Sequence, residues 1–258
     1  MRNILAIAAK DLRSQFVSPI AYVVLTGFML LGGWFFYNLL TRFAFLLNLY
    51  LSFRNPEAME RLNLNEFVIA PLLHNLSVIL VILVPVITMR SFAEEKRSGT
   101  YELLMTSPLS VTEVVLGKFL GAFGFVFIML LLTGIYPLIL VIIGGNPEMG
   151  VIFSGYLGLL LLATSFVSVG LLTSSFTDNQ IVAAVTCLVG LLLLYVISWP
   201  ADTAGETMGA ILKYASLTEH FSELVKGVID TRDLAYFGSV IILALFLTQR
   251  SVESLRWR

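Results

Sequence analysis

The sequence is poor in charged residues. Only 13% of its 258 residues are Asp, Glu, Lys or Arg, whereas a water-soluble domain carries about 25%. Hydrophobic residues make up 58%. Because the few charges fall between long apolar runs, a large soluble core does not explain the deficit. The runs approach the roughly 20 residues that a helix needs to cross about 30 Å of hydrocarbon. We therefore predict an all-α integral membrane protein.

Cysteine and histidine are almost absent. The single cysteine, Cys187, cannot form an internal disulfide and is expected to be a small buried apolar residue. His74 and His220 are the only histidines, and they are expected to be ordinary interfacial residues. The sequence contains neither a Gly-x-Ser-x-Gly nor a His-Glu-x-x-His pattern. We expect no catalytic residue, no metal and no cofactor.

A nucleotide-binding loop is also missing. The only Gly-Lys pair, Gly117-Lys118, is followed by Phe119, and Thr112 stands where the phosphate loop requires its first glycine. The chain is therefore not expected to be an enzyme, and any ATP hydrolysis must come from another polypeptide. The formal net charge of −1 gives no indication of a nucleic-acid partner.

The chain begins with a segment that resembles an interfacial helix rather than a span. In residues 1–17, the apolar side chains of Ile4, Leu5, Ala8, Leu12 and Phe16 can share one face, with charged residues elsewhere. This pattern is typical of a helix that lies in the headgroup layer. Ser18-Pro19 then supplies an N-cap and a proline at the first helical position, which predicts a new helix.

Six membrane spans are predicted, over about 20–41, 71–90, 117–143, 151–174, 180–199 and 234–249. Their centres hold almost no ionisable groups. A charge there costs about 2.5–3.5 kcal/mol and usually marks ion coupling or a proton relay, so an ion-driven carrier is disfavoured. Pro85 and Pro137 can kink the second and third spans. Gly117 and Gly121 have small-xxx-small spacing, which we interpret as close packing within the chain, with a dimer seam as the alternative.

The distribution of basic residues predicts the orientation. Ten of the sixteen Lys and Arg residues lie on one side if the N-terminus is cytoplasmic. These are Arg2, Lys10, Arg13, Arg90, Lys96, Arg97, Lys118, Arg250, Arg256 and Arg258. The positive-inside rule therefore places both termini in the cytoplasm.

Two outer segments are more than turns. Residues 42–70 begin with an aromatic and leucine-rich stretch, so the first span is expected to extend outward or to bend into the interface. Residues 206–228 contain the capping-box sequence Ser216-Leu217-Thr218-Glu219 and a stop at Gly227, which predicts an outer helical segment before the last span. Either segment is a candidate site for an extracytoplasmic partner.

The most informative segment lies between the second and third spans. Four consecutive charges, 94–97, precede the helix breaker Gly99, and a short helix over about 98–108 is expected to end at Ser107-Pro108. Ser110-Val111-Thr112-Glu113 is a capping box that opens the next helix. A charged loop that only fixes topology is the plainer alternative. It does not explain a capped helix with several apolar residues in water, whereas a docking surface for a soluble partner does.

Residues 94–110 read Glu-Glu-Lys-Arg-Ser-Gly-Thr-Tyr-Glu-Leu-Leu-Met-Thr-Ser-Pro-Leu-Ser. This stretch resembles the segment that follows the second span of type-2 ABC transporter permeases. The sequence of 113–121, Glu-Val-Val-Leu-Gly-Lys-Phe-Leu-Gly, is similar to that family's start of the third span. Residues 9–14 and 18–22, Ala-Lys-Asp-Leu-Arg-Ser and Ser-Pro-Ile-Ala-Tyr, are similar to the gliding-motility-associated (GldF-like) branch.

The resemblance implies a single permease domain over 1–258 that forms the membrane pathway of an exporter in a bacterial inner membrane. It implies two copies of a separate ABC ATPase subunit and a second permease subunit, among membrane lipids. The residues that it places at or beside the ATPase contact are Glu94, Glu95, Arg97, Gly99, Thr100, Glu102, Leu103, Leu104, Ser107 and Pro108. A membrane anchor that recruits a soluble complex without transport is the alternative function.

Overall fold

The computed structural model describes residues 2–53, 62–100 and 109–255, and the elements in these ranges are helices. The all-α prediction is confirmed. In chain order the helices are α1 (Arg2–Val17), α2 (Pro19–Ser52), the π-helix η1 (Asn65–Ile69), α4 (Ala70–Thr88), α5 (Arg90–Arg97), α7 (Val111–Thr133), α8 (Ile135–Ile142), α9 (Met149–Phe176), α10 (Gln180–Val196), α11 (Glu206–Ala215), α12 (Leu217–Val225) and α13 (Thr231–Leu255).

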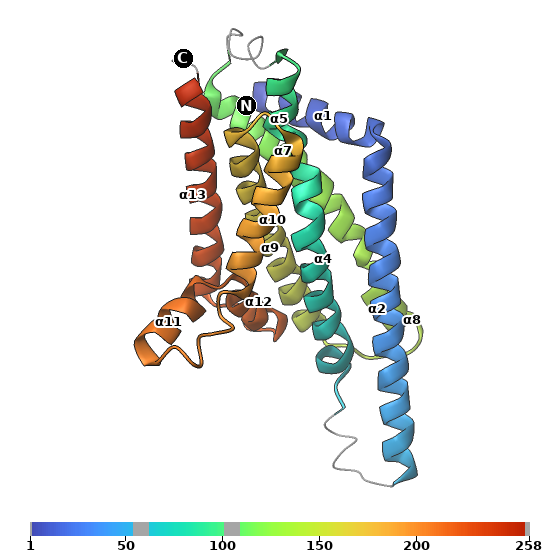
Figure 1. Ribbon diagram of the computed structural model, residues 1–258. Helices are drawn as coiled ribbons and strands as arrows, with labels where there is room; N and C mark the ends of the chain where they lie inside the picture. The colour runs from blue at the N-terminus through green and yellow to red at the C-terminus, as the bar shows by residue number, and fades with distance from the viewer. Residues whose placement is uncertain (1, 54–61, 101–108, 256–258) are drawn as a thin grey trace.

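The long helices run side by side as a bundle with two distinct ends (Figure 1). At one end lie α1, α5 and the last turns of α13, and we call it the termini face because both chain termini are there. The far face carries α11, α12 and the end of α2. In the described residues, five helical stretches are long and apolar enough to cross a membrane: Pro19–Ser52, Asn65–Arg97, Val111–Ile142, Met149–Phe176 and Thr231–Ser254. The 17-residue α10 is a shorter apolar helix.

Helix α9 occupies the centre of the bundle and packs against α4, α10, α12 and α13. Small residues allow these helices to pack closely, because a larger side chain at the same positions would collide with a neighbouring helix. A Cβ at Gly158 would lie 2.8 Å from Leu224 of α12, and one at Gly170 would overlap Thr88 of α4. Close packing of apolar helices therefore depends on small side chains facing each contact.

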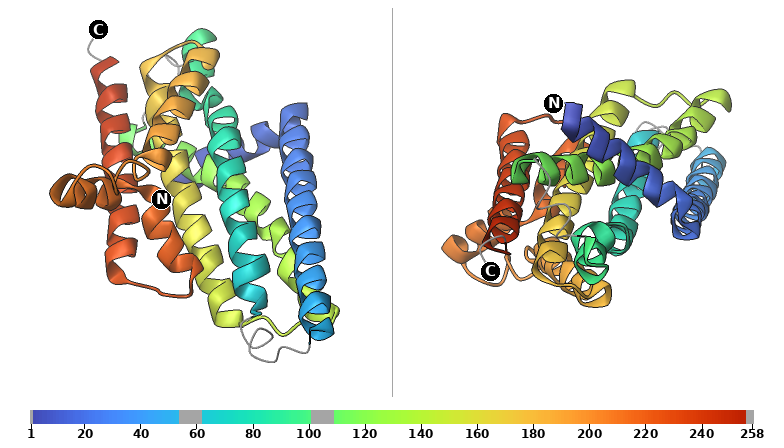
Figure 2. Two further views of the ribbon diagram at one scale, coloured as in Figure 1. Left: turned by 60° about the horizontal axis from the view of Figure 1, so that its bottom comes forward. Right: turned by 90° about the horizontal axis from the view of Figure 1, so that it is seen from above.

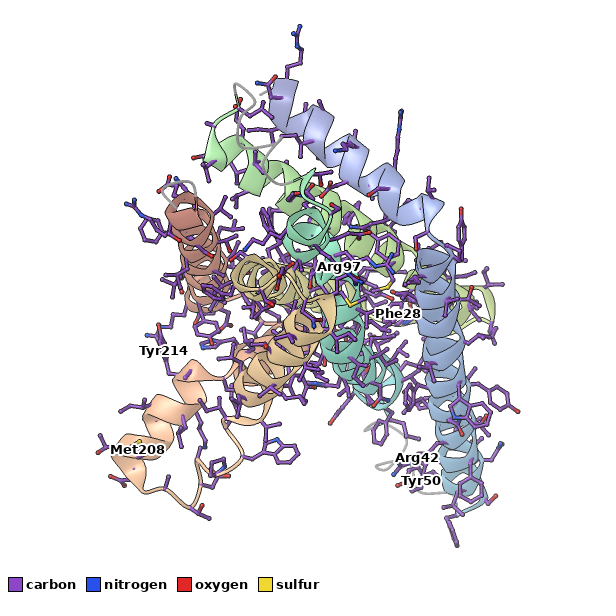
Figure 3. All side chains as sticks on the ribbon, turned by 45° about the horizontal axis from the view of Figure 1, so that its top comes forward. Phe28, Arg42, Tyr50, Arg97, Met208 and Tyr214 are labelled. Atoms are coloured by element: carbon purple, nitrogen blue, oxygen red, sulfur yellow. The ribbon has the colours of Figure 1, made fainter. Side chains whose placement is uncertain are left out.

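Helix α2 packs against the bundle along only part of its length. Its buried residues recur every three or four positions between Ala21 and Phe36, which is one face of a helix. Phe28, which is fully buried, points from α2 toward the bundle, whereas Arg42 and Tyr50 lie on the projecting part (Figure 3). At about 1.5 Å per residue, the 34 residues of α2 exceed the thickness of the hydrocarbon core. Helix α2 therefore continues as one helix beyond residue 41, where the first span was predicted to end.

The third long stretch is broken between α7 and α8, close to Pro137. Pro137 has no N–H group and cannot bond to the carbonyl of Thr133 four residues earlier. The Tyr156 hydroxyl of α9 donates to that carbonyl at 2.9 Å instead. The second stretch continues past Pro85 and is interrupted only at Met89, between α4 and α5.

Helix α1 lies across the bundle at the termini face rather than along it (Figure 2, right). It contacts α7 at the two glycines of the small-xxx-small pair. A Cβ at Gly117 would lie 2.6 Å from Ile7, and one at Gly121 would lie 2.7 Å from Asp11. The pair therefore serves packing within the chain, as interpreted from the sequence. The prediction that Leu5 lies on the buried apolar face of α1 was wrong, because Leu5 is 64% exposed. Ile7 faces α7 instead.

Capping residues explain where several helices begin. The hydroxyl of Ser18 accepts from the N–H of Ile20, and Ser110 and Glu113 form the predicted capping box. Before α10, the cap is Asn179, whose side chain accepts from two backbone N–H groups. The hydroxyl of Thr177, two residues earlier, accepts from the N–H of Asn179.

Candidate functional site

Helix α5 carries the described part of the predicted ATPase-contact segment. Glu94, Glu95 and Arg97 lie on α5, and Gly99 follows it with a φ of +73°, a conformation that favours glycine. The hydroxyls of Ser98 and Thr100 both donate to the carbonyl of Glu95 and close the end of the helix. The other predicted contact residues, Glu102, Leu103, Leu104, Ser107 and Pro108, lie outside the described residues, as does most of the predicted helix over 98–108.

A buried lysine joins α5 to two other helices. Lys118 of α7 is 2% exposed, and its Nζ atom lies 2.7 Å from Glu95 Oε1 of α5 and 3.6 Å from Asp11 Oδ2 of α1. The ammonium also lies 5.3 Å from the centroid of the Phe92 ring. Burying an isolated charge is costly, so an ammonium in this position requires its carboxylate partners. The Lys118 cluster, defined as Lys118, Glu95, Asp11 and Phe92, therefore ties three helices together.

Burial also affects the carboxyl group of Asp11. It raises the pKa of Asp11 above its ordinary value of 3.8, and the Lys118 ammonium opposes this rise only in part. The nearby carboxylate of Glu95 adds to the rise. Asp11 therefore takes up a proton more readily than an exposed aspartate does, and Glu95 is the closer ion-pair partner of Lys118.

A serine of α9 joins α5 to the central helix. The Ser174 hydroxyl accepts from the N–H groups of Phe92 and Ala93 at 3.0 and 3.2 Å, and it donates to the carbonyl of Met89 at 3.0 Å. These two N–H groups belong to the first turn of α5, where no carbonyl of the same helix is available. Ser174 therefore caps α5 from another helix.

The next residue of α9 extends the connection. The carbonyl of Ser175 accepts from the ammonium of Lys96 and, at 3.3 Å, from the hydroxyl of Ser251 in α13. Helix α5 is thus linked through α9 to α13, and through Lys118 of α7 to α1. Arg97, by contrast, is exposed at the end of α5, and α5 lies at the termini face (Figure 1).

A cavity of about 490 Å³ opens beside the Lys118 cluster. It lies between α1, α2, α4, α5 and α7, and its wall combines charged residues with an apolar patch. Its polar lining includes Lys10, Gln15, Arg90, Glu94 and Glu95. Pockets of about 300–1,000 Å³ are the usual size of small-molecule sites.

The family of the chain follows from comparison with known proteins. Residues 50–248 match the family model described as "ABC-2 family transporter protein". This range covers most of the chain, from the end of α2 to α13. The chain belongs to the ABC-2 family. It is a transmembrane subunit of an ABC transporter, and the matched domain is a membrane domain rather than a nucleotide-binding one. Comparison with curated proteins finds no match.

The far face of this ABC-2 protein contains a buried histidine with a structural role. His220 Nδ1 lies 2.6 Å from Asp233 Oδ1, and Nε2 lies 3.0 Å from the carbonyl of Tyr214. The ring stacks on Tyr236, whose hydroxyl donates to the carbonyl of Ala215. These bonds hold α11 and α12 against α13. In the described parts of the chain, no three His, Cys, Asp or Glu side chains are grouped so as to hold a metal ion.

Sequence reasoning missed two members of the Lys118 cluster, Lys118 itself and Asp11. Lys118 was assigned to the cytoplasmic surface as a topology determinant, and Asp11 was assigned to the polar face of an interfacial helix. The available signal was that Lys118 falls inside the predicted span 117–143, because a charge within a span normally has a partner. Ser174 gave no comparable signal, since serine is common in membrane helices.

Proposed function

We propose that the chain is the permease subunit of an ATP-driven exporter, with the termini face in the cytoplasm and separate ATPase subunits docked on it. The observation that carries this proposal is the fixed position of α5. It leads into the predicted docking segment over 98–108 and is bonded to α7 and α9, and these helices are bonded in turn to α1 and α13. A force applied to that segment therefore reaches most of the bundle.

The positions of the termini support six crossings. Both termini lie at one face (Figure 1), which favours an even number of crossings. Five stretches meet the length expected of a span, and α10 supplies the sixth crossing. At 17 residues it reaches the lower end of the range for transmembrane helices. Arg90, Lys96 and Arg97 then lie on the cytoplasmic side, in accordance with the positive-inside rule.

The proposed coupling uses the contacts of α5 in sequence. Closure of the ATPases upon binding ATP displaces the 98–108 segment and with it α5. The Lys118–Glu95 ion pair transmits the displacement to α7, and the bonds of Ser174 transmit it to α9. The interruptions at Met89 and Gly134 are places where the second and third spans can bend. The family implies that the pathway forms between two permease subunits.

The deciding experiment measures ATP hydrolysis by the complex purified from native membranes. We expect an ATPase subunit to co-purify, and we expect the permease to alter its rate of hydrolysis. Glu102→Ala and Leu104→Ala are expected to abolish that alteration while leaving the permease folded in the membrane. Arg13→Ala, at an exposed position on α1 outside the docking segment, is the control and is expected to behave as wild type.

The alternative function, a membrane anchor for a soluble complex, gives a different result. An anchor would bind its partner without changing the rate of ATP hydrolysis, and Glu102→Ala would affect only binding. Purification of the chain without any ATPase would contradict the permease proposal itself.

A further inference from the structure

The ring of His220 in α12 is held at both of its nitrogens. Its Nε2 atom lies 3.0 Å from the backbone carbonyl oxygen of Tyr214 in α11, and its Nδ1 atom lies 2.6 Å from Asp233 Oδ1 in α13. A backbone carbonyl can only accept a hydrogen bond, so Nε2 must carry a hydrogen and donate it. The contact with Tyr214 thus fixes the position of one ring hydrogen.

The short contact with Asp233 requires a second hydrogen. Two acceptors without a hydrogen between them would repel each other at 2.6 Å, so a hydrogen lies between Nδ1 and Oδ1. Imidazole is ordinarily a stronger base than a carboxylate, and we therefore assign this hydrogen to Nδ1. His220 is then an imidazolium that pairs with the ionised Asp233. A neutral imidazole beside an ionised carboxylate has one hydrogen too few for the two contacts.

The surroundings of the ring leave this proton to the pair. The side chains of His220 and Asp233 are only 10% and 8% exposed. Tyr236 of α13 stacks on the ring, and Tyr214 of α11 contacts it edge-on. These two phenols and Asp233 are the titratable side chains that face the ring from α11 and α13.

The other two helices that pack against α12 direct their tyrosines elsewhere. Tyr156 of α9 donates to the carbonyl of Thr133, and Tyr195 of α10 bonds to Ser77. The remaining charged side chains of the far face are exposed, namely Glu219 and Glu223 of α12, Glu206 and Lys213 of α11 and Arg232 of α13. In the described chain, Asp233 is thus the carboxylate that pairs with the ring.

Helix α11 depends on this ring for its position. It projects from the far face of the bundle (Figure 1), and Figure 3 shows Met208 and Tyr214 on it. Of its ten residues, all of them described, only Gly209 is buried. Two bonds at its end attach it to the neighbouring helices: the carbonyl of Tyr214 accepts from His220, and that of Ala215 accepts from the hydroxyl of Tyr236. Loss of the first bond therefore loosens α11.

Removal of the second hydrogen breaks one of the two contacts of His220. If the remaining hydrogen stays between Nδ1 and Asp233, Nε2 presents a lone pair to the carbonyl of Tyr214, and that bond is lost. If it stays on Nε2, Nδ1 and the carboxylate repel each other. The bond to the carboxylate is the stronger of the two because its acceptor is charged. The bond to Tyr214 is consequently the one that breaks.

We propose that His220 and Asp233 form a proton-binding site, in which one bound proton holds α11 against α12 and α13 and its loss at higher pH releases α11. The ring can donate at both nitrogens only in its doubly protonated form, so the far face responds to the pH of the compartment that it meets. The site lies on the far face, and its behaviour is independent of the orientation of the chain and of coupling to an ATPase.

Nitrogen-15 NMR of the full chain in lipid nanodiscs counts the ring hydrogens. His74 and His220 are the only histidines, so histidine labelling gives the signals of two rings, and His74→Phe assigns them. At about pH 6 we expect both nitrogens of His220 to carry a hydrogen, and we expect one of them to lose it as the pH rises to about 10. A His220 nitrogen without a hydrogen or a hydrogen-bond donor at about pH 6 would overturn the proposal.

A spin label on α11 measures its release. The label is attached at Met208→Cys, an exposed position of α11, in a chain whose only cysteine is removed by Cys187→Ala. We expect the ratio of released to held α11 to rise at least about tenfold between about pH 6 and about pH 10, as for the loss of one charged hydrogen bond. Label mobility that stays constant over this range would overturn the proposal.

Asp233→Asn removes the need for the proton. The side-chain amide can donate to Nδ1 while Nε2 of the neutral ring donates to Tyr214, so both contacts survive. We expect this variant to hold α11 over the whole pH range. His220→Phe keeps a ring beside Tyr236 but loses both hydrogen bonds, and it is expected to release α11 over the whole range.

His74→Phe is the matched control, because it makes the same change at a ring that contacts Phe221 edge-on. It is expected to keep the pH response of the wild type. A response in Asp233→Asn equal to that of the wild type, or loss of the response in His74→Phe, would show that another group is the sensor and would overturn the proposal. The NMR measurement on the wild-type sequence keeps the test valid if a variant fails to fold.

Discussion

The ammonium of Lys118 lies 2.7 Å from Glu95 Oε1, although the two residues stand on different helices and are separated by the predicted docking segment. The pair therefore joins the two ends of the segment between Glu95 and Lys118. In our proposal, residues 98–108 in the middle of this segment dock on the ATPase. Because Lys118 is almost fully buried, the pair is shielded from solvent and from salt.

Removal of the lysine should be strongly destabilising. Lys118→Met keeps the length of the side chain but leaves Glu95 as a partly buried carboxylate without its partner. Breaking a buried ion pair costs about 3–5 kcal/mol, and thermal unfolding in detergent measures the loss. Lys226→Met breaks the exposed pair with Glu223 and should cost less than about 1 kcal/mol. Equal stability of the two variants would contradict the structural role of Lys118.

Asp11 should make stability depend on pH with a defined sign. Because the pKa of its carboxyl is raised in the folded state, the folded chain keeps a proton at pH values where the unfolded chain has lost it. The stabilising contribution is complete below the ordinary value of 3.8 and is lost as the pH rises through the higher folded value. Asp11→Asn should therefore gain in melting temperature relative to wild type as the pH increases from about 4 to about 7.

Asp202 provides the control for that measurement. Its exposed carboxyl pairs with Lys213, and this partner lowers its pKa below 3.8. Its contribution is therefore complete above 3.8 and is lost only at lower pH. The difference in melting temperature between Asp202→Asn and wild type should therefore stay constant over the pH range in which the difference for Asp11→Asn grows. If the difference in melting temperature between Asp11→Asn and wild type does not change with pH, the carboxyl of Asp11 in the wild-type protein stays ionised throughout this range.

Loss of the Ser174 hydroxyl should loosen α5 without disturbing the rest of the bundle. Ser174→Ala leaves the N–H groups of Phe92 and Ala93 unpaired in a buried position, which we expect to cost about 2 kcal/mol or more. Hydrogen exchange should show the loss locally, at these two amides. Ser168→Ala is the matched control, because the Ser168 hydroxyl is equally buried but bonds only within its own helix. Exchange that rises equally in both variants would argue against a specific cap.

A methyl group at Gly121 should displace α1 from α7. Its Cβ would lie 2.7 Å from the Cβ of Asp11, so Gly121→Ala is expected to cost about 1–3 kcal/mol through overpacking. At Gly190 of α10 nothing lies within 4 Å of an added Cβ, so Gly190→Ala should be neutral or stabilise the helix by up to about 1 kcal/mol. Thermal unfolding compares the two, and equal stability would mean that α1 adjusts freely.

The sequence was sufficient to predict the elements whose signals are local. Long apolar runs, the capping box at Ser110 and Glu113, and the left-handed glycines Gly99 and Gly227 all reflect the preferences of a few neighbouring residues. The close approach of α7 to another helix was readable from the spacing of its glycines. The identity of the approaching helix, α1, could not be predicted, because Gly117 and Gly121 indicate only that some neighbour lies close to them.

The candidate site was predicted only where it lies in one segment. Glu94, Glu95 and Arg97 were identified from a continuous stretch, whereas Asp11, Lys118 and Ser174 join them from three other helices. Those contacts depend on how α1 crosses the bundle and on α9 being central, and both follow from packing among distant residues. Small side chains on α9 were visible in the sequence, but their number alone does not specify which neighbours approach them.

The Lys118 cluster also has a consequence for the order in which the protein is made. Asp11 and Glu95 both precede Lys118 in the chain, so a ribosome delivers the two carboxylates before the ammonium. When the helix that carries Lys118 reaches the membrane, both of its partners are already present. The most costly charge of this end of the bundle therefore arrives last, at a position where its counter-ions have been assembled.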